Sequence, residues 1–189
     1  MQVSSKALLR KEALARRAAV PASLRDDFAS ELARVVPGLI RRLGTYRFLA
    51  SFTSIRDEVD TGALNSALVE AGFAVGLPVA TPGEPLMFRQ WTPQTRMVSG
   101  YKKIPEPDAS APTLIPDLVL MPLAAFDARG GRIGYGGGFY DRTLEALPGV
   151  PTLGLAFSCQ EVALVPQESH DVALAFVLTE RGLRKFRSD

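Results

Sequence analysis

Four of the five residues from position 134 to position 138 are glycine, with Arg132 just before them and Asp141 just after. Glycine permits positive φ angles and leaves room for a ligand to approach the backbone, so successive N–H groups can bind phosphate oxygens. Arg132 adds a cation beside these groups, and Asp141 offers the hard oxygen ligand that Mg²⁺ favours. The segment therefore predicts a site for a phosphate-bearing ligand that binds together with Mg²⁺.

This glycine-rich segment differs from the two commonest phosphate-binding sequences. It lacks the Gly-x-x-x-x-Gly-Lys-Ser/Thr pattern of P-loop nucleotidases, and its spacing does not match the Gly-x-Gly-x-x-Gly fingerprint of dinucleotide-binding proteins. Both classes are disfavoured. The plainer alternative is a structural turn in which Asp141 is a charge at a helix start, but a turn rarely needs four glycines.

The N-terminal segment is basic, with nine Lys or Arg against four acids in residues 1–42. Lys6 and Arg10 are one helical turn apart, so both can serve an anionic ligand or simply decorate an exposed helix. A nucleic-acid-binding protein is a further alternative. It lacks support, because the rest of the chain holds 13 basic and 16 acidic residues and no RNA-binding signature.

Length and composition are those of one globular domain. The chain has 189 residues, of which 47% are apolar, and no apolar run approaches the length that crosses a bilayer. The start of the sequence has no pattern of a secretory signal, so we expect a cytoplasmic protein. With one cysteine, Cys159, and one histidine, neither an internal disulfide nor a structural zinc site is expected.

Hydrophobic periodicity predicts an alternation of helices and strands along the chain. Ser4 or Ser5 can cap the first helix, and Ser23 with Asp26 resembles a capping box for the second. Ser158 and Thr179 are interpreted as further helix starts. The expected helices cover residues 4–18, 23–43, 61–72 and 139–147, and the expected strands cover 46–52, 73–79, 86–91, 118–121, 152–157 and 174–178. This order predicts a single-domain α/β protein whose mostly parallel sheet has helices on both faces.

The segment from Phe126-Asp127 through Gly131-Arg132-Ile133-Gly134-Tyr135-Gly136-Gly137-Gly138-Phe139-Tyr140-Asp141-Arg142 resembles the signature of the 5-formyltetrahydrofolate cyclo-ligase family. Three other blocks agree in order and spacing. Lys6 to Arg10, followed by Arg16 or Arg17, resembles the family's nucleotide-binding Lys-x-x-x-Arg element. The segments 52–61 and 166–171 resemble those that supply a folate-contacting glutamate and a second magnesium-site aspartate.

The resemblance implies an ATP- and Mg²⁺-dependent enzyme that closes 5-formyltetrahydrofolate to 5,10-methenyltetrahydrofolate through a phosphorylated formyl intermediate. It also implies a cytoplasmic monomer without nucleic-acid or membrane partners, with the three-layer sandwich of sugar-phosphate isomerases and CoA transferases. Catalysis is assigned to Arg132 and Tyr140, and the metal ion to Asp141 and Asp171. ATP binding is assigned to Lys6, Arg10, Arg132, Gly134, Gly136, Gly137, Gly138 and Tyr140, and substrate binding to Phe52, Glu58, Tyr135, Gly136, Gly137, Gly138 and Phe139.

The sequence departs from the family pattern at a few positions. Gly137 stands where some members have a lysine, Val79 replaces a frequent basic residue, and the aromatic position expected to stack on folate falls near Tyr101 or Lys102. The main rival from another enzyme class is a sugar-phosphate isomerase or CoA transferase on a related fold. Such an enzyme would bind a substrate phosphate in the glycine loop without using ATP.

Overall fold

The computed structural model describes residues 5–168 and 171–186. Its helices are α1 (Lys6–Ala18), α2 (Ala22–Leu43), α3 (Gly62–Glu70) and α4 (Phe139–Ala146), and single 3₁₀ turns occur at Tyr101–Lys103 and Ser158–Gln160. Ser5 caps α1 by accepting a hydrogen bond from the Leu8 N–H, and Gly44 ends α2, as the sequence predicted. Within the described residues, no helix combines the length and apolar character needed to span a membrane.

Eight strands form one mixed sheet in the order β12-β11-β10-β7-β1-β2-β3-β6. The five central strands from β11 to β2 are parallel, whereas β12, β3 and β6 pair antiparallel at the two edges. The strands are β1 (Phe48–Ala50), β2 (Ala74–Val79), β3 (Met87–Trp91), β6 (Thr113–Leu114), β7 (Leu118–Pro122), β10 (Thr152–Leu155), β11 (Phe176–Thr179) and β12 (Gly182–Lys185). The predicted α/β class with a mostly parallel sheet is confirmed.

Two small hairpins stand outside this sheet. The first pairs β4 (Met97–Ser99) with β5 (Pro105–Pro107), and the second pairs β8 (Ala125–Phe126) with β9 (Arg132–Ile133). The first hairpin lies between the expected strands 86–91 and 118–121, where the sequence predicted no helix or strand. The second places β9 directly before the glycine-rich segment, so these glycines connect a hairpin strand with α4.

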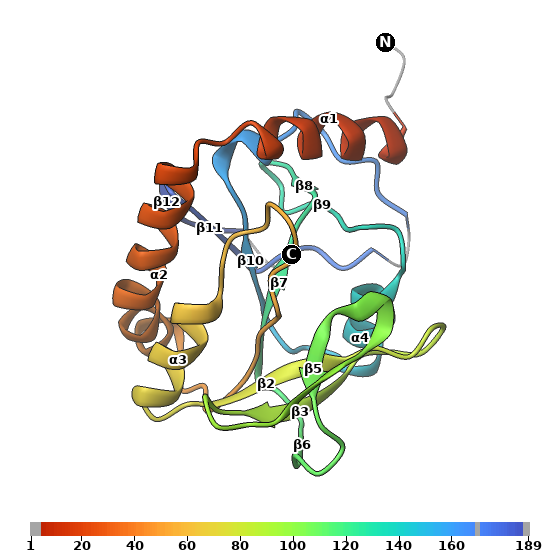
Figure 1. Cartoon of the computed structure of the whole chain (residues 1–189). Helices are drawn as coiled ribbons and strands as arrows, with labels where there is room; N and C mark the ends of the chain where they lie inside the picture. The colour runs from red at the N-terminus through yellow and green to blue at the C-terminus, as the bar shows by residue number, and fades with distance from the viewer. Residues whose placement is uncertain (1–4, 169–170, 187–189) are drawn as a thin grey trace.

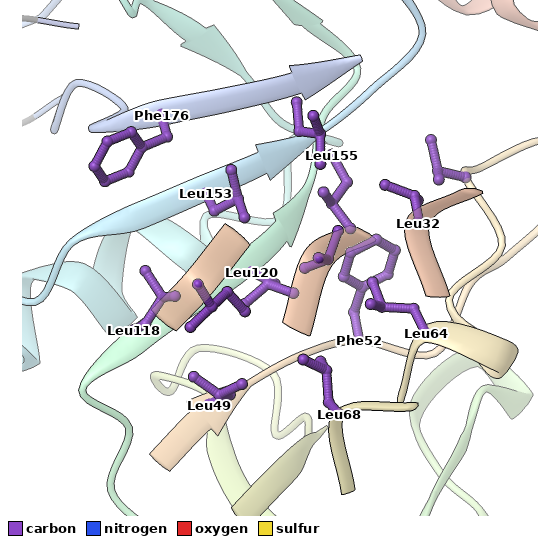
Figure 2. Packing of buried hydrophobic residues seen from close by; sticks show 14 of the residues in the cluster. Leu32, Leu49, Phe52, Leu64, Leu68, Leu118, Leu120, Leu153, Leu155 and Phe176 are labelled. Carbon is purple, nitrogen blue, oxygen red and sulfur yellow. The ribbon is translucent and has the colours of Figure 1, made fainter. Parts of the chain in front are cut away.

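The sheet has a hydrophobic layer on each face, as the alternation of side chains along its central strands requires. In β7, Leu118 and Leu120 pack with residues of α2 and α3, whereas Val119 and Met121 pack with Leu144 of α4. Figure 2 shows the first layer, where leucines of α2 and α3 meet leucines of the central strands. Helices therefore cover both faces.

Helix α1 lies across the end of the sheet at which the parallel strands terminate (Figure 1). Its Ala13 is fully buried and packs with Ala124, Ala125, Ile133 and Val165, which follow strand β7 or precede the C-terminal strands. Ligands of open α/β sheets bind at this edge, because the loops that follow the strands gather there. The fold thus brings a basic helix from the N-terminus to the edge that carries the glycine-rich segment.

Three of the predicted helix starts are wrong. Ser23 lies inside α2, which begins at Ala22 after Pro21 and has no side-chain cap. Ser158 begins a single 3₁₀ turn, and no longer helix follows it in the described part of the chain. Its N–H and its hydroxyl both donate hydrogen bonds to the Glu180 carboxylate. Thr179 leads into a hairpin with β12, since Gly182 adopts a positive φ of 115° there and the chain turns back along β11.

The buried face of α1 also differs from the prediction. From the sequence alone, hydrophobic periodicity predicts an apolar face that holds Leu8, Leu9, Ala13 and Leu14 and leaves Arg17 elsewhere. In the structure Leu8 is 46% exposed, whereas Arg17 is only 3% exposed. The face of α1 that turns inward therefore includes a charged residue, and that residue lies close to the candidate site.

Candidate functional site

A cleft of about 370 Å³ opens beside the glycine-rich segment at the end of the parallel strands. Loops that follow β1, β2, β7 and β9 contribute to its walls, together with α1 and the 101–106 segment. Every residue that the sequence analysis assigned to a ligand lines this cleft: Lys6, Arg10, Phe52, Glu58, Arg132, Gly134, Tyr135, Gly136, Gly137, Gly138, Phe139, Tyr140, Asp141 and Asp171. The structure brings them together, and their individual roles stay predictions.

The glycine-rich segment forms one wall of the cleft. Gly136 and Gly138 have φ angles of 88° and 65°, in the left-handed region that favours glycine, so two of the four glycines meet a conformational need. Gly138 occupies the N-cap position of α4 and gives that helix no side-chain cap. At Gly134 an added Cβ would meet no atom within 4 Å, so the backbone there lies open to an approaching group.

Helix α1 contributes two cations to this wall. The Arg10 Nε donates a hydrogen bond of 2.7 Å to the Gly134 carbonyl, and its guanidinium lies 3.7 Å from the position that a Cβ on Gly136 would take. One turn earlier, the Lys6 Nζ lies 2.6 Å from the Asp171 Oδ2 and 3.2 Å from the Glu168 Oε1. The i, i+4 spacing therefore places both side chains in the cleft.

Arg132 is the most buried cation of the cleft, at 8% exposure. Its guanidinium donates hydrogen bonds to the Val172 carbonyl and to the Asp141 carboxylate. Burial lowers the pKa of Arg132, while the charges of Asp141 and Asp171 act in the opposite direction. Both carboxylates therefore lie close to the same buried cation, although 30 residues separate them in the sequence.

The two aspartates are the candidate metal ligands. Among the described residues, no group of three or more His, Cys, Asp or Glu side chains could hold a metal ion by itself. This donor set fits Mg²⁺, which commonly takes one or two carboxylates and completes its shell with water and substrate phosphates. His170, next to Asp171, lies outside the described residues.

Apolar and aromatic side chains also line the cleft, and Glu58 lies among its lining residues. Phe52 is one of them, and the Tyr101 and Phe139 rings meet edge to face with their centroids 5.6 Å apart. Glu58 is 7% exposed and accepts a hydrogen bond of 2.9 Å from the Ile55 N–H. Burial raises the pKa of Glu58 above its ordinary value, although hydrogen bonds with Tyr135 and the Ile55 N–H oppose the shift.

Tyr135 and Tyr140 border Glu58. Burial and the nearby Glu58 charge raise the pKa of both phenols, so both keep their protons at neutral pH. Tyr140 can therefore act as a hydrogen-bond donor but not as a base at neutral pH. The lining of the cleft thus includes aromatic surface, a buried carboxylate and protonated phenols, which suits a flat heterocycle that carries N–H donors.

Arg17 contacts the hydroxyl of Tyr135, although no role of its own could be predicted for it from the sequence. The signal was weak, because Arg17 follows Arg16 in a run of basic residues and looked like part of an exposed face. The position expected to stack on folate fell near Tyr101 or Lys102. Lys102 lines the cleft and lies over the Tyr101 ring, with the Nζ 5.3 Å from the centroid.

Comparisons with known proteins show the family of the chain. A model of the 5-formyltetrahydrofolate cyclo-ligase family matches residues 2–180. The chain is 40% identical over 139 residues to the 5-formyltetrahydrofolate cyclo-ligase of Escherichia coli (strain K12), covering 69% of this chain and 76% of that protein. It is 33% identical over 197 residues to the corresponding protein of Mycolicibacterium smegmatis, covering 99% of this chain and 100% of that protein.

Two solved structures share the fold. The 5,10-methenyltetrahydrofolate synthetase of Aquifex aeolicus superposes with a TM-score of 0.81 at 25% identity, covering 97% of this chain and 94% of that chain. The synthetase of Mycoplasma pneumoniae gives a TM-score of 0.73 at 21% identity, covering 92% of this chain and 98% of that chain. The second likeness concerns the fold alone.

Proposed function

The chain belongs to the 5-formyltetrahydrofolate cyclo-ligase family, and we propose that the cleft is where it uses ATP to convert 5-formyltetrahydrofolate to 5,10-methenyltetrahydrofolate. The observation that carries this proposal is that two sets of residues line one cleft: a glycine-rich segment with cations, and apolar side chains with a buried carboxylate. The first suits the phosphates of ATP, and the second suits a reduced pterin.

The reaction must turn a poor leaving group into a good one. In 5-formyltetrahydrofolate the formyl oxygen belongs to an amide on N5. Electron donation from N5 lets this oxygen attack the γ-phosphorus of ATP, so that an O–P bond forms and the bond to ADP breaks. N10 then attacks the formyl carbon, the C–O bond breaks, and inorganic phosphate leaves while N10 loses its proton. The products are 5,10-methenyltetrahydrofolate, ADP and phosphate.

Phosphoryl transfer of this kind depends on positioning and charge neutralisation more than on a protein nucleophile. We assign the phosphates of ATP to the backbone N–H groups of residues 134–138, at the start of α4, and to the cations Lys6, Arg10 and Arg132. A helix N-terminus and a glycine-rich turn both favour anions. Arg132 is held by the Val172 carbonyl and the Asp141 carboxylate, so its guanidinium is already ordered for the transfer.

Asp141 and Asp171 are the residues that would hold Mg²⁺ with ATP. When bound, this ion neutralises phosphate charge and polarises the γ-phosphoryl group. In the structure each aspartate contacts a cation, Asp141 with Arg132 and Asp171 with Lys6. Phosphate oxygens can take over as partners of the two cations, which leaves the carboxylates to bind the metal ion. The charges of the site are therefore matched both with and without the nucleotide.

We assign the folate to Phe52, Glu58, Tyr135 and Phe139, with Gly136, Gly137 and Gly138 beneath it. The Glu58 carboxylate can accept hydrogen bonds from the N–H groups of a pterin, and Tyr140 can donate a hydrogen bond at the junction between the two substrates. We also propose that the architecture is the three-layer sandwich of sugar-phosphate isomerases and CoA transferases. The proposed reaction differs from the reactions of those enzymes because it requires ATP.

An absorbance assay for 5,10-methenyltetrahydrofolate tests the proposal directly. Product should form with 5-formyltetrahydrofolate, ATP and Mg²⁺ together and fall to background when any one of them is omitted. Asp26→Asn serves as a control variant, because Asp26 is an exposed residue of α2 outside the cleft and should leave the rate unchanged. Cyclisation at the same rate without ATP would overturn the proposal and would favour an enzyme that needs no phosphoryl donor.

A further inference from the structure

Arg17 is a charged residue buried beside the residues assigned to the folate. It lies in the last turn of α1 and is 3% exposed. Its Nη1 donates a hydrogen bond to the Tyr135 hydroxyl, and its Cζ lies 5.6 Å from the centroid of the Tyr135 ring. Tyr135 itself is 41% exposed and lines the cleft, so Arg17 supports it from the protein side.

The environment of Arg17 is not that of a residue retained for packing. Within the part of the chain that the structure describes, its buried Nε–H has no hydrogen-bond partner. A buried donor without a partner destabilises the folded state, and more so on a charged group. A methionine would fill similar space without this cost. The burial of a guanidinium here is therefore explained better by what its charge and its Nη1 do.

Tyr135 connects Arg17 to Glu58. Its hydroxyl accepts a hydrogen bond from Arg17 and is also a hydrogen-bond partner of the Glu58 carboxylate. The other charged and titratable groups that act on Glu58 are Arg56 in its own loop and Tyr140 in α4. Burial raises the pKa of Glu58, whereas the Tyr135 hydrogen bond and the charges of Arg17 and Arg56 lower it.

A second contact ties the Glu58 loop to the end of α1. Arg25 donates from Nη2 to the carbonyls of Arg17 and Ala18, at 3.3 and 3.0 Å, and its Nη1 lies 3.3 Å from the Asp57 Oδ1. Asp57 is the neighbour of Glu58 in the sequence. The end of α1 and the loop that carries Glu58 are thus joined at two independent places.

We propose that Arg17 is a positioning residue for the reaction, which acts through Tyr135 to hold the Glu58 carboxylate in the orientation that accepts the N–H groups of the pterin. The inference rests on the proposed function, since it concerns how the same cleft binds its folate. Arg17 is not among the residues that line the cleft, so we expect it to touch neither substrate. Its effect should therefore appear in the binding of folate and not in the binding of ATP.

Arg17→Met and Tyr135→Phe test this inference, with Arg16→Met as the matched control. Arg16 neighbours Arg17 on α1 but donates to the carbonyls of Cys159 and Glu161, away from Glu58. Both test variants should raise the KM for 5-formyltetrahydrofolate about tenfold, the factor that corresponds to one pKa unit of lost interaction. The KM for ATP should change by less than about twofold, because in the described part of the chain neither Arg17 nor the Tyr135 hydroxyl forms a hydrogen bond with Lys6, Arg10 or Arg132, the cations assigned to the phosphates.

The pH profile provides a readout that a purely structural role would not move. Arg17 and the Tyr135 hydroxyl both lower the pKa of Glu58, so removing either raises it. The acidic limb of kcat/KM for the folate should therefore shift to higher pH in both variants. The double variant should resemble the single variants, because Arg17 acts on Glu58 through Tyr135. Arg16→Met should keep the profile of the unmodified protein.

The outcomes separate the two proposals. If the unmodified protein makes no 5,10-methenyltetrahydrofolate, the proposed function fails. If it is active but Tyr135→Phe keeps both the folate KM and the pH profile, the inference about Arg17 is overturned and the reaction stands. Tyr135→Phe still tests the inference about Arg17 if Arg17→Met does not fold. The Tyr135→Phe change removes only a hydroxyl from a partly exposed ring. Equal losses in folate and ATP use would also contradict the inference.

Discussion

Lys6 and Arg132 each contact a carboxylate of the cleft, and these contacts define the electrostatics of the site at the scale of single residues. Burial lowers the pKa of Lys6, but hydrogen bonds with Asp171 and Glu168 outweigh burial and raise it above its ordinary value. Lys6 therefore stays charged through the neutral range. The pairing adds little stability, since Lys6 is partly exposed and such ion pairs contribute weakly. Its importance lies in where it places charge.

Replacing either candidate metal ligand should change the need for magnesium. Asp141→Asn and Asp171→Asn keep the size and one carbonyl oxygen but remove the negative charge that a hard divalent ion favours. We expect each to raise the Mg²⁺ concentration for half-maximal rate by roughly tenfold and to lower the rate itself. Asp141 should show the larger effect, because it adjoins the glycine-rich segment and contacts Arg132 directly. A magnesium titration of the cyclisation rate measures both changes.

Asp26→Asn is the control for this titration, because it removes the same charge from an exposed position on α2. Its magnesium dependence should overlay that of the unmodified protein. If the curves of Asp141→Asn and Asp171→Asn overlay it as well, neither aspartate binds the metal ion. Asp141 would then be a charge in the first turn of α4 and Asp171 a partner of Lys6.

At the scale of elements, the turn from β9 into α4 depends on glycine at two positions. Gly138 has a φ of 65° and begins α4, and an added Cβ would lie 2.6 Å from the Arg142 Nη1. We expect Gly138→Ala to lower the free energy of unfolding by about 1–2 kcal/mol, the usual cost of a left-handed conformation for a residue with a Cβ. The Arg142 side chain can move away from the added Cβ, so most of the loss in stability should come from the left-handed backbone conformation. Urea denaturation measures the change.

Gly134→Ala is the matched variant for stability. Its φ lies outside the left-handed region and no atom lies within 4 Å of the added Cβ, so its free energy of unfolding should change by less than about 0.5 kcal/mol. Equal destabilisation by the two variants would contradict the proposed role of backbone conformation at Gly138.

Elements with strong local signals could be predicted from the sequence. The run from Leu118 to Met121 predicted the central strand β7, and the glycines followed by Phe139 predicted α4. Thr179 was misassigned because a threonine followed by charges is typical of a helix start. Pairing of Phe176 with Lys185 across the sheet determines the outcome there instead. Strand pairing between distant residues has no comparable local signal in the sequence.

The candidate site also contains residues that could be predicted from the sequence and one that could not. The glycine-rich segment and its flanking charges could be identified from residue types and spacing, and the structure places them in one cleft. The burial of Arg17 could not be predicted, because it depends on the Tyr135 hydroxyl, which lies 118 residues away in the sequence. An arginine on a basic helix is ordinarily exposed, so periodicity favoured the wrong face.

At the scale of the whole molecule, one sheet runs from β6 at one edge to β12 at the other, and we propose that the chain is a single domain that acts as a monomer. Strand β12 is exposed along its length and carries Arg184 and Lys185, whose charges discourage pairing with a second copy. The opposite edge strand, β6, has only two residues. Light scattering should give the mass of one chain, 20.4 kDa, over a wide range of protein concentration. A mass that doubles with concentration would contradict this.

We propose that the cleft joins the formyl oxygen of the folate to the γ-phosphorus of ATP. A heavy oxygen isotope placed in the formyl group of 5-formyltetrahydrofolate follows this transfer, because the mechanism moves that oxygen to phosphorus and never to water. After a single turnover with ATP and Mg²⁺, mass spectrometry should find the label in the inorganic phosphate. Label found in water, with unlabelled phosphate, would show that ATP hydrolysis and ring closure are separate events and would rule out a phosphorylated formyl intermediate.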